Sequence, residues 1–325
     1  MKILLVKTSS LGDVVHNLPV ASDIRTRFPG AAIDWVVEEG FAEIPRLHPA
    51  VRRVIPVAVR RWRHNLLSAA TWRELRAYRD TVRAETYDLV LDTQGLVKSA
   101  LLARKARGKR VGHAVASARE PLAARFYDVT YSIPKDLHAV ERNRRLAAAA
   151  LDFAPGLPLD YGIAAAPLAA PWLPAAPYSV LLTASSRVDK LWPEAGWLRL
   201  GAALNARGLA CVLPGGSAAE RDRAARLAEG MATAVVAPPM GIGELAQLLA
   251  GARLVVGVDT GLSHLAAALS RPTVCLFAGS RPELTGVHAG ESALNLGGAG
   301  QPPTAEDVTA AVDGLIGRMP AAAEP

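Results

Sequence analysis

Cysteine is nearly absent from this chain of 325 residues, which contains only Cys211 and Cys275. Both lie in apolar, strand-like segments, and we interpret them as reduced, buried hydrophobic residues. The sequence contains no Cys/His spacing that is typical of a zinc site. It therefore predicts neither a disulfide-stabilised fold nor a metal centre.

Long hydrophobic runs are also missing. The apolar segment Ile3–Val6 is interrupted by Lys7 and is too short for a signal peptide. No later segment approaches the roughly 20 apolar residues that a membrane-spanning helix needs. We therefore expect a cytoplasmic protein, either free or bound peripherally to a membrane surface.

Two phosphate-binding signatures are absent as well. The chain has neither G-x-x-x-x-G-K-[ST], the P-loop motif, nor the dinucleotide motif G-x-G-x-x-G. Their absence argues against a P-loop nucleotidase and against an NAD-dependent oxidoreductase.

What remains is the composition of a globular protein with an excess of positive charge. Half of the residues are hydrophobic, and a chain of 325 residues exceeds the usual size of one core, so two domains are expected. Lys and Arg outnumber Asp and Glu by 37 to 30, which gives a net charge of +7. The excess indicates an acidic partner: a nucleic acid, a phosphate-bearing substrate or an anionic membrane.

A proline-rich stretch between Ala154 and Pro177 interrupts the pattern of the chain. Proline removes a backbone donor and restricts the residue before it, so regular structure is not expected there. We place the domain boundary in this stretch, with an N-terminal lobe at 1–165 and a C-terminal lobe at 166–325. The last helix is a candidate to pack back on the N-terminal lobe.

Short apolar runs alternate with amphipathic stretches on both sides of this break. The predicted strands are Lys2–Lys7, Ile33–Val37, Leu89–Leu91, Tyr178–Thr183, Ala210–Leu213, Ala234–Ala237, Leu254–Val258 and Val274–Phe277. The predicted helices are Val14–Phe28, His138–Leu151, Trp197–Arg207, Ala218–Glu229, Gly243–Ala250 and Leu262–Leu269. This α/β alternation predicts two Rossmann-like, doubly wound lobes. Ligands bind at the carboxyl ends of such strands, so the two lobes are expected to face a central cleft.

The turn Lys7–Asp13 follows the first predicted strand and opens a helix. Ser9, Ser10 and Gly12 suit a tight loop whose free backbone N–H groups can bind an anion. Asp13 is either a helix cap, which the residues alone favour, or a carboxylate that faces a substrate, and the two roles are compatible.

Two loops of the C-terminal lobe suit a phosphate-bearing ligand. The segment Val258–His264 (VDTGLSH) follows an apolar strand, and the N–H groups that open the next helix can hold a diphosphate. We favour this reading over a capped helix with a packed histidine. The loop Ser185–Pro193 carries two hydroxyls and Lys190, which is a weaker phosphate signal.

A basic cluster lies in the N-terminal lobe, where Arg60, Arg61 and Arg63 flank Trp62. Part of this region is expected to be a solvated helix face with ion pairs. The density of arginines suits phosphate or carboxylate recognition. Nucleic acid is a possible partner by charge, but no nucleic-acid-binding module accompanies the cluster.

With these residues in view, the chain resembles the lipopolysaccharide heptosyltransferase I family from Met1 to about Pro282. The matching segments are VKTSSLGDVVHNLP near the start, DWVVEEGFAEIP from Asp34, RVIPVAVRRWR from Arg53, YDLVLDTQGLVKSA from Tyr87, AREPLA from Ala118, HAVER from His138, DKLWPE from Asp189 and VDTGLSHLAAAL from Val258. Together these segments are highly specific.

The resemblance implies a GT-B fold, with an acceptor-binding N-terminal lobe and a C-terminal lobe that binds ADP-heptose. It implies inverting, metal-independent transfer of L-glycero-D-manno-heptose from ADP-heptose to Kdo of Kdo-lipid A. No cofactor is implied, because ADP-heptose is the donor substrate. The partners are then the donor, the lipid acceptor and the anionic inner-membrane surface, at whose cytoplasmic face the enzyme would act peripherally; nucleic acid is not among them.

The resemblance also carries roles for individual residues. Asp13 corresponds to the general base and Lys190 to the lysine that contacts the donor phosphates. The other donor-binding positions are Ser185, Ser186, Glu220, Met240, Asp259, Thr260, Gly261 and His264. The acceptor-binding positions are Arg60, Arg61, Arg63, Arg119 and Arg142.

The chain departs from the family pattern at two places in the donor lobe. Gly215-Gly216 stands where Trp-Gly is expected, and the segment 278–282 (AGSRP) replaces Gly-Pro-Thr-Asp-Pro. These changes bear on sugar or adenine contacts rather than on the reaction class.

Three alternatives remain at this point. One is the nucleotide-binding oxidoreductase, disfavoured above. Another is a basic module without activity that binds nucleic acid or anionic lipid, which ADP would not stabilise. The nearest is the same chemistry on another core acceptor, as in heptosyltransferase II.

Overall fold

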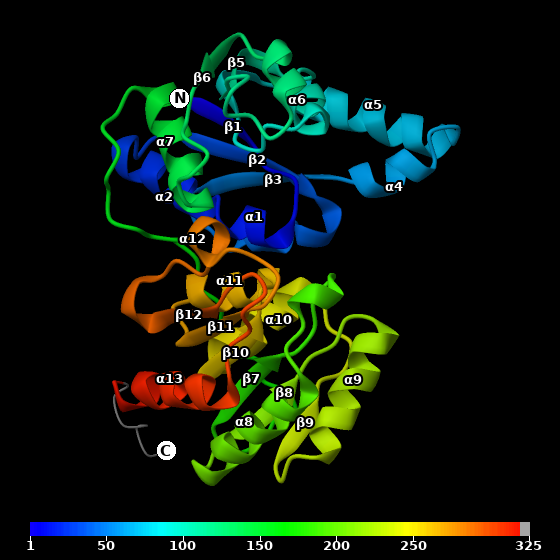
Figure 1. Cartoon of the computed structure of the whole chain (residues 1–325). Helices are drawn as coiled ribbons and strands as arrows, with labels where there is room; N and C mark the ends of the chain where they lie inside the picture. Colours follow the sequence, from blue (N-terminus) through cyan, green and yellow to red (C-terminus); the bar gives the residue numbers. More distant parts are fainter. Residues whose placement is uncertain (319–325) are drawn as a thin grey trace. The chain divides into compact units, whose positions relative to one another are not determined.

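The computed structural model describes residues 1–318, and the chain divides into two compact units, Met1–Ile163 and Ala164–Pro325. The division lies between residues 163 and 164, inside the proline-rich stretch. The sequence analysis placed it between residues 165 and 166 of the same stretch. Each unit contains one six-stranded sheet (Figure 1). All pairings between neighbouring strands in both sheets are parallel.

The N-terminal unit is built around a sheet with the order β3-β2-β1-β4-β5-β6. Its strands are β1 (Lys2–Val6), β2 (Ala32–Glu38), β3 (Val51–Val57), β4 (Thr86–Asp92), β5 (Arg107–His113) and β6 (Val129–Tyr131). Its α-helices are α1 (Leu11–Val15), α2 (Leu18–Arg27), α3 (Glu43–Arg46), α4 (Val59–His64), α5 (Ala69–Arg83), α6 (Val97–Ala103) and α7 (Ala139–Leu151). The strand order reverses between β1 and β4, so the carboxyl ends of these two strands form the switch point of the unit.

The C-terminal unit repeats this plan with the order β12-β11-β10-β7-β8-β9. Its strands are β7 (Tyr178–Leu182), β8 (Ala210–Leu213), β9 (Ala234–Val236), β10 (Leu254–Val258), β11 (Thr273–Phe277) and β12 (Ala293–Gly297). Its α-helices are α8 (Glu194–Ala206), α9 (Ala218–Glu229), α10 (Ile242–Gly251), α11 (Gly261–Ala268), α12 (Pro282–Thr285) and α13 (Ala305–Gly317). Here the strand order reverses between β7 and β10.

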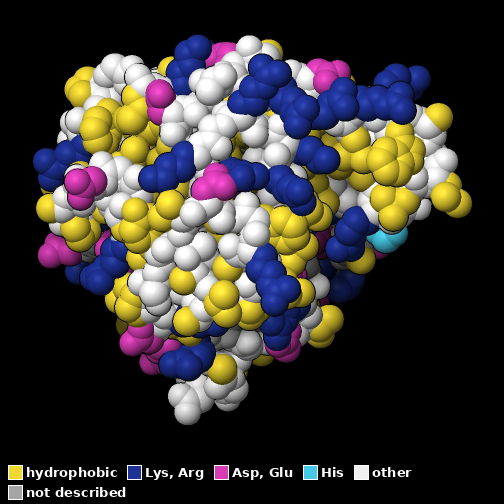
Figure 2. All heavy atoms as spheres, turned by 90° about the horizontal axis from the view of Figure 1, so that it is seen from above, with side chains coloured by type: hydrophobic (Ala, Val, Ile, Leu, Met, Phe, Trp, Pro, Cys, Tyr) yellow, Lys and Arg dark blue, Asp and Glu magenta, His cyan; other side chains and the backbone are white. Residues whose placement is uncertain are grey.

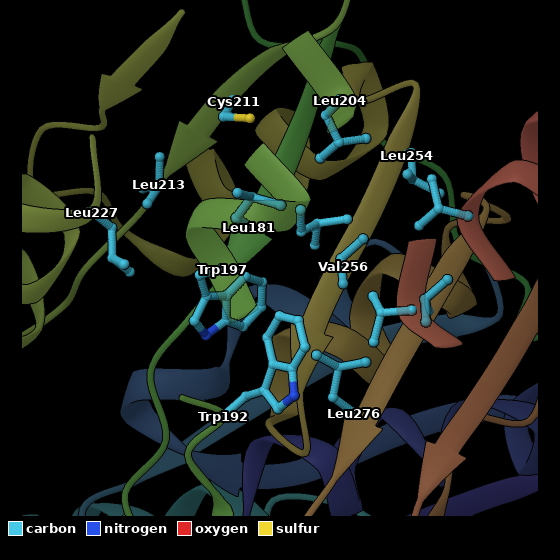
Figure 3. Close-up of a cluster of buried hydrophobic side chains, with 14 of the residues drawn as sticks. Leu181, Trp192, Trp197, Leu204, Cys211, Leu213, Leu227, Leu254, Val256 and Leu276 are labelled. Carbon is cyan, nitrogen blue, oxygen red and sulfur yellow. The ribbon is translucent and has the colours of Figure 1, made fainter. Parts of the chain in front are cut away.

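Large apolar side chains from α8 and from the strands fill the main core of the C-terminal unit (Figure 3). Trp197 on α8 is fully buried and meets Trp192 edge to face, with ring centroids 5.1 Å apart. Aromatic pairs prefer this geometry over a face-to-face sandwich. The core holds the strand ends, and hence the loops that follow them, in fixed positions.

One expectation about a helix needs correction. The single helix expected over Val14–Phe28 is two helices, α1 and α2. Pro19 in the first turn of α2 has no N–H to continue the hydrogen-bond ladder, so the helix breaks before it. The last helix, α13, packs into the core of its own unit through Val308, Val312 and Leu315. Packing of this helix on the N-terminal lobe stays a prediction. Residues 319–325, which the sequence analysis assigned to the C-terminal lobe, lie outside the described part of the chain.

Candidate active site

Asp259 is the first residue after β10, at the switch point of the C-terminal unit. Lys190 Nζ donates a 2.6 Å hydrogen bond to Asp259 Oδ2, and the Ser280 hydroxyl donates to the same oxygen. His264 Nε2 lies 3.6 Å from Asp259 Oδ1. Residues from three separate segments of the chain therefore meet at one carboxylate.

The charge of this carboxylate follows from its contacts. Burial raises the pKa of Asp259, but the hydrogen bonds from His264, Lys190 and Ser280 outweigh burial and hold the pKa well below its usual range. Asp259 is therefore ionised and fixes the Lys190 ammonium beside it. An ammonium has three N–H donors, so Lys190 can bind an anion while it remains bonded to Asp259.

Helix α11 begins immediately after Asp259 and adds further donors. Thr260 is its N-cap residue in an extended conformation, and Gly261 is its first residue. The first N–H groups of a helix have no partner within the helix, and the helix dipole is positive at this end. The Ser263 hydroxyl donates to Val258 O over 2.8 Å, which ties the first turn of α11 to the end of β10. The start of α11 next to Lys190 is therefore suited to hold an anion.

The remaining donor-side candidates lie on neighbouring connections of the same unit. The Ser185 hydroxyl donates to Asp259 O over 3.4 Å, and Ser186 is exposed beside it. Glu220 is a cap of α9, because its Oε2 accepts hydrogen bonds from Gly216 N at 2.8 Å and Ser217 N at 3.0 Å. Met240 is half-buried between β9 and α10. Ser185 is thus placed in the Asp259 cluster, whereas the Glu220 carboxylate is engaged in the helix cap.

The sequence analysis did not select Ser280, although it noted the segment that contains it as a departure. The neighbouring Gly279 explains why this segment reaches the site. A Cβ atom at Gly279 would lie 2.7 Å from the backbone oxygen of Asp189, so only glycine permits the close approach of the two loops. This close approach brings the Ser280 hydroxyl to Asp259 and fixes the position of the loop that carries Lys190.

In the N-terminal unit, Asp13 lies on α1 at the switch point. Ser10 N and Ser10 Oγ donate to Asp13 Oδ2 at 2.8 Å and 3.1 Å, which is the geometry of a helix cap. Arg119 Nη1 lies 3.8 Å from the same oxygen. Within residues 1–318 no hydrogen bond to Asp13 Oδ1 occurs, and the side chain is 28% exposed. Asp13 therefore caps α1 through one oxygen and presents the other as a free acceptor.

Hydrogen bonds between buried polar groups connect the elements around Asp13. Lys7 Nζ donates to Thr93 O at 3.2 Å and to Asn143 Oδ1 at 3.4 Å. Asn143 Nδ2 in turn donates to His16 O at 3.2 Å, at the end of α1. Burial lowers the pKa of Lys7, while Asp13 and Asp92 act in the opposite direction. Lys7 and Asn143 thus link the helix that carries Asp13 to β1 and α7, a connection that no sequence motif indicated.

A basic cavity of about 250 Å³ lies in the same unit. Its lining consists of Ser9, Val59, Arg60, Arg63, His64 and Lys98. Lys98 Nζ donates to Ser9 Oγ at 3.0 Å, and burial together with Arg60 and Arg63 lowers its pKa, against the effect of Glu38. A concentration of cationic groups with few carboxylates around one cavity suits an anionic ligand.

The other arginines expected on the acceptor side are placed differently. Arg61 pairs with Glu39 at 3.1 Å and Glu74 at 2.9 Å and is not among the residues that line the cavity. Arg119 is 68% exposed beside Asp13. Arg142 is half-buried, donates to Ser117 O at 2.8 Å, and has a buried Nε without a partner in the described residues. Arg60 and Arg63 share the cavity, and Arg119 joins Asp13.

Two features are absent from the described residues. Within 1–318, no group of three or more His, Cys, Asp or Glu side chains could hold a metal ion. In the same range, no helix has the length and apolar character that crossing a bilayer requires.

Comparisons with known proteins show the family of the chain. The family model described as glycosyltransferase family 9 (heptosyltransferase) matches residues 75–310. Lipopolysaccharide heptosyltransferase 1 of Pseudomonas aeruginosa is 51% identical over 299 residues, which cover 91% of this chain and 84% of the relative.

Two solved structures are similar over nearly the whole chain. The structure of Escherichia coli heptosyltransferase WaaC with ADP has a TM-score of 0.90 at 44% identity and covers 97% of this chain and 100% of that one. The same enzyme with ADP-2-deoxy-2-fluoro heptose has a TM-score of 0.84 and covers 98% of this chain and 99% of that one. The fold is therefore the GT-B fold of the heptosyltransferases, and the chain belongs to glycosyltransferase family 9, the heptosyltransferase family.

Proposed function

We propose that this enzyme transfers L-glycero-D-manno-heptose from ADP-heptose to Kdo of Kdo-lipid A, with inversion at the sugar carbon. The observation that carries the proposal is the anion-binding assembly in the C-terminal unit, where Lys190 and the start of α11 meet at Asp259. A diphosphate matches this assembly because its charge meets an ammonium and free N–H groups. The relatives that bind ADP and an ADP-heptose analogue share the fold of this unit.

The proposed reaction is a single displacement. Oδ1 of Asp13 accepts the proton of the acceptor hydroxyl, whose oxygen forms a bond to the anomeric carbon of heptose. The bond from that carbon to the ADP phosphate oxygen breaks, and its electron pair leaves with ADP. Lys190 and the N–H groups of α11 stabilise the charge that grows on the diphosphate. The cap through Oδ2 holds the carboxylate of Asp13 in one orientation.

The acceptor assignment rests on the basic cavity of the N-terminal unit. Arg60, Arg63 and Lys98 line this cavity and are candidates to bind the phosphates and sugar carboxylates of Kdo-lipid A. We propose further that the protein works without a cofactor or metal and acts peripherally at the cytoplasmic face of an anionic membrane. Activity that is lost in EDTA and restored by magnesium would contradict the metal-independent part.

The test is a reconstitution with ADP-heptose and Kdo-lipid A, read by product mass and ADP release. We expect one heptose per acceptor and one ADP per heptose. A matched reaction contains an acceptor that already carries one heptose. Turnover of that acceptor alone would favour the second candidate, a heptosyltransferase II-like activity. Relatives that are 51% and 49% identical to this chain are named lipopolysaccharide heptosyltransferase 1, which favours the first candidate.

A further inference from the structure

The hairpin formed by α4 and α5 ends in an exposed apolar tip. Leu66 is 56% exposed, Leu67 is fully exposed at 102%, and Trp72 is 53% exposed. The buried residues of α5 are Thr71, Tyr78 and Val82, so Trp72 lies outside the face that packs on the protein. Figure 2 shows apolar side chains at the right-hand edge of the view, where α4 and α5 extend in Figure 1.

The tip is an ordered part of the structure. Trp72 Nε1 donates a 2.8 Å hydrogen bond to Leu66 O, which closes the turn between the two helices. Ser68 caps α5 by accepting from Ala70 N at 3.3 Å. The indole N–H is thus satisfied by the turn itself, while the ring stays exposed. A group of leucine and tryptophan held on a turn, with its polar atoms already bonded, is suited to enter an apolar phase.

Positive charge surrounds this tip. Arg61 and Arg79 are paired with carboxylates, but Arg63, Arg73 and Arg76 form no ion pair within residues 1–318. All three are exposed, as is His64 next to the turn. Figure 2 shows dark-blue Lys and Arg side chains next to the apolar ones. Arginines beside an apolar projection are complementary to anionic headgroups around an acyl phase.

We propose that Leu66, Leu67 and Trp72 form a membrane-insertion tip that docks the protein on an anionic bilayer. The unpaired arginines Arg73 and Arg76 bind the headgroups around it, whereas Arg63 belongs to the basic cavity. The tip begins two residues after His64, which lines the basic cavity. Docking at this point therefore brings the cavity to the lipid surface, where the headgroup of a lipid-linked acceptor would enter. The proposal rests on the proposed function for this last step only, since docking itself needs no acceptor.

The first experiment measures co-sedimentation with vesicles of phosphatidylglycerol and phosphatidylethanolamine, and with neutral phosphatidylcholine vesicles. We expect binding to the anionic vesicles and a loss of about tenfold or more in the partition coefficient of the L66S/L67S variant. The matched control is L101S/L122S, which removes two other exposed leucines of the same unit and should bind like wild type. Equal binding of L66S/L67S and wild type, or a loss confined to the control, overturns the proposal.

The second measurement uses Trp72 as a reporter. Anionic vesicles should shift tryptophan emission of the wild type to shorter wavelength, and brominated acyl chains should quench it. Trp72→Phe keeps an apolar ring, so it should bind vesicles but lose most of the shift. A full shift in Trp72→Phe, or self-association without vesicle binding, contradicts insertion of this tip.

Turnover separates docking from catalysis. With Kdo-lipid A dispersed in detergent micelles, L66S/L67S should retain wild-type kcat, which also shows that the variant is folded. With Kdo-lipid A in vesicles, its rate should fall in parallel with vesicle binding. If no acceptor is turned over by any form, the proposed function fails, while the vesicle measurements still decide whether the tip docks.

Discussion

Lys190 and Asp259, which are 69 residues apart in the sequence, are joined by a 2.6 Å hydrogen bond at the carboxyl end of β10. The pair explains how a long, flexible lysine is held in one place before a substrate arrives. Holding the ammonium in advance means that little reorganisation is needed when charge develops on the leaving diphosphate.

Removal of this ammonium should therefore affect both donor binding and the chemical step. We expect Lys190→Met to weaken ADP binding and to lower kcat by roughly 10²–10³-fold, the range for loss of one donor that stabilises the transition state. Calorimetry with ADP and steady-state kinetics measure the two effects. Asp259→Asn should weaken ADP binding less, because it removes the group that positions Lys190 but leaves the ammonium present. Unchanged ADP affinity and kcat in Lys190→Met would remove Lys190 from the site.

Asp13 should act through its free carboxylate oxygen. Asp13→Asn keeps an oxygen that can cap α1 but removes the base, so kcat should fall by roughly 10²–10⁴-fold. The melting temperature and the affinity for ADP should stay close to wild type. Ser10→Ala is the matched variant, because it removes only the side-chain partner of the cap and should reduce kcat far less. A variant Asp13→Asn with near-normal turnover would reduce Asp13 to a cap.

From β7 to β11 the strands and helices of the C-terminal unit could be predicted closely from the sequence, whereas β12 and α12 were not predicted. Buried parallel strands such as β10 are continuous apolar runs, and α9 carries a capping box at its start. β3 and β5, which were not predicted, lack such a continuous apolar run. β5 contains Arg107, Lys109 and Arg110 at exposed or half-buried positions, and β3 contains two arginines and Pro56. β3 pairs with β2, and β5 pairs with β4 and β6, and a local sequence pattern cannot show such pairing.

The sequence indicated which residues belong to the candidate site, but not which of them contact one another. The strand-end loops indicated Asp13, Lys190 and Asp259, because such loops carry ligands in doubly wound sheets. Ser280 reaches Asp259 only because Gly279 lets two loops approach, and this contact depends on the tertiary structure. The density of arginine also drew attention to Arg61, which the fold places between two carboxylates. Its role in acceptor binding stays a prediction.

Two neighbouring arginines of the N-terminal unit should differ in their effect on acceptor binding. Arg63 lines the basic cavity and forms no ion pair within the described chain, so Arg63→Ala should raise the KM for Kdo-lipid A about tenfold or more. Arg61 is already paired, so Arg61→Ala should change this KM little. Arg63→Lys should recover only part of the loss, since a point charge cannot replace the planar fork. The KM for ADP-heptose is the internal control; if it rises and the acceptor KM does not, the two substrates have been assigned to the wrong units.

Two buried histidines should make stability sensitive to mild acid. Burial lowers the pKa of His48 to about 4, with a contribution from Arg25 and against the effect of Asp160. Burial also lowers the pKa of His113 to about 3, with Arg142 and Lys7 acting in the same direction. In the unfolded chain a histidine titrates near pH 6.5.

At a pH between the folded-state pKa of each histidine and about 6.5, the unfolded chain binds a proton that the folded chain does not. The free energy of unfolding therefore falls as the pH drops below about 6.5. Above that pH both states are neutral and neither histidine contributes. Within this window, each histidine should lower the free energy of unfolding by about 1.4 kcal/mol for every unit by which the pH falls. His48→Asn keeps an acceptor for Ala50 N, so it is a conservative way to remove one titrating group. From pH 7.5 to 5.5 we expect wild type to lose about 1.4 kcal/mol more than His48→Asn in urea unfolding. An identical pH dependence in wild type and His48→Asn would show that His48 is protonated in the folded state.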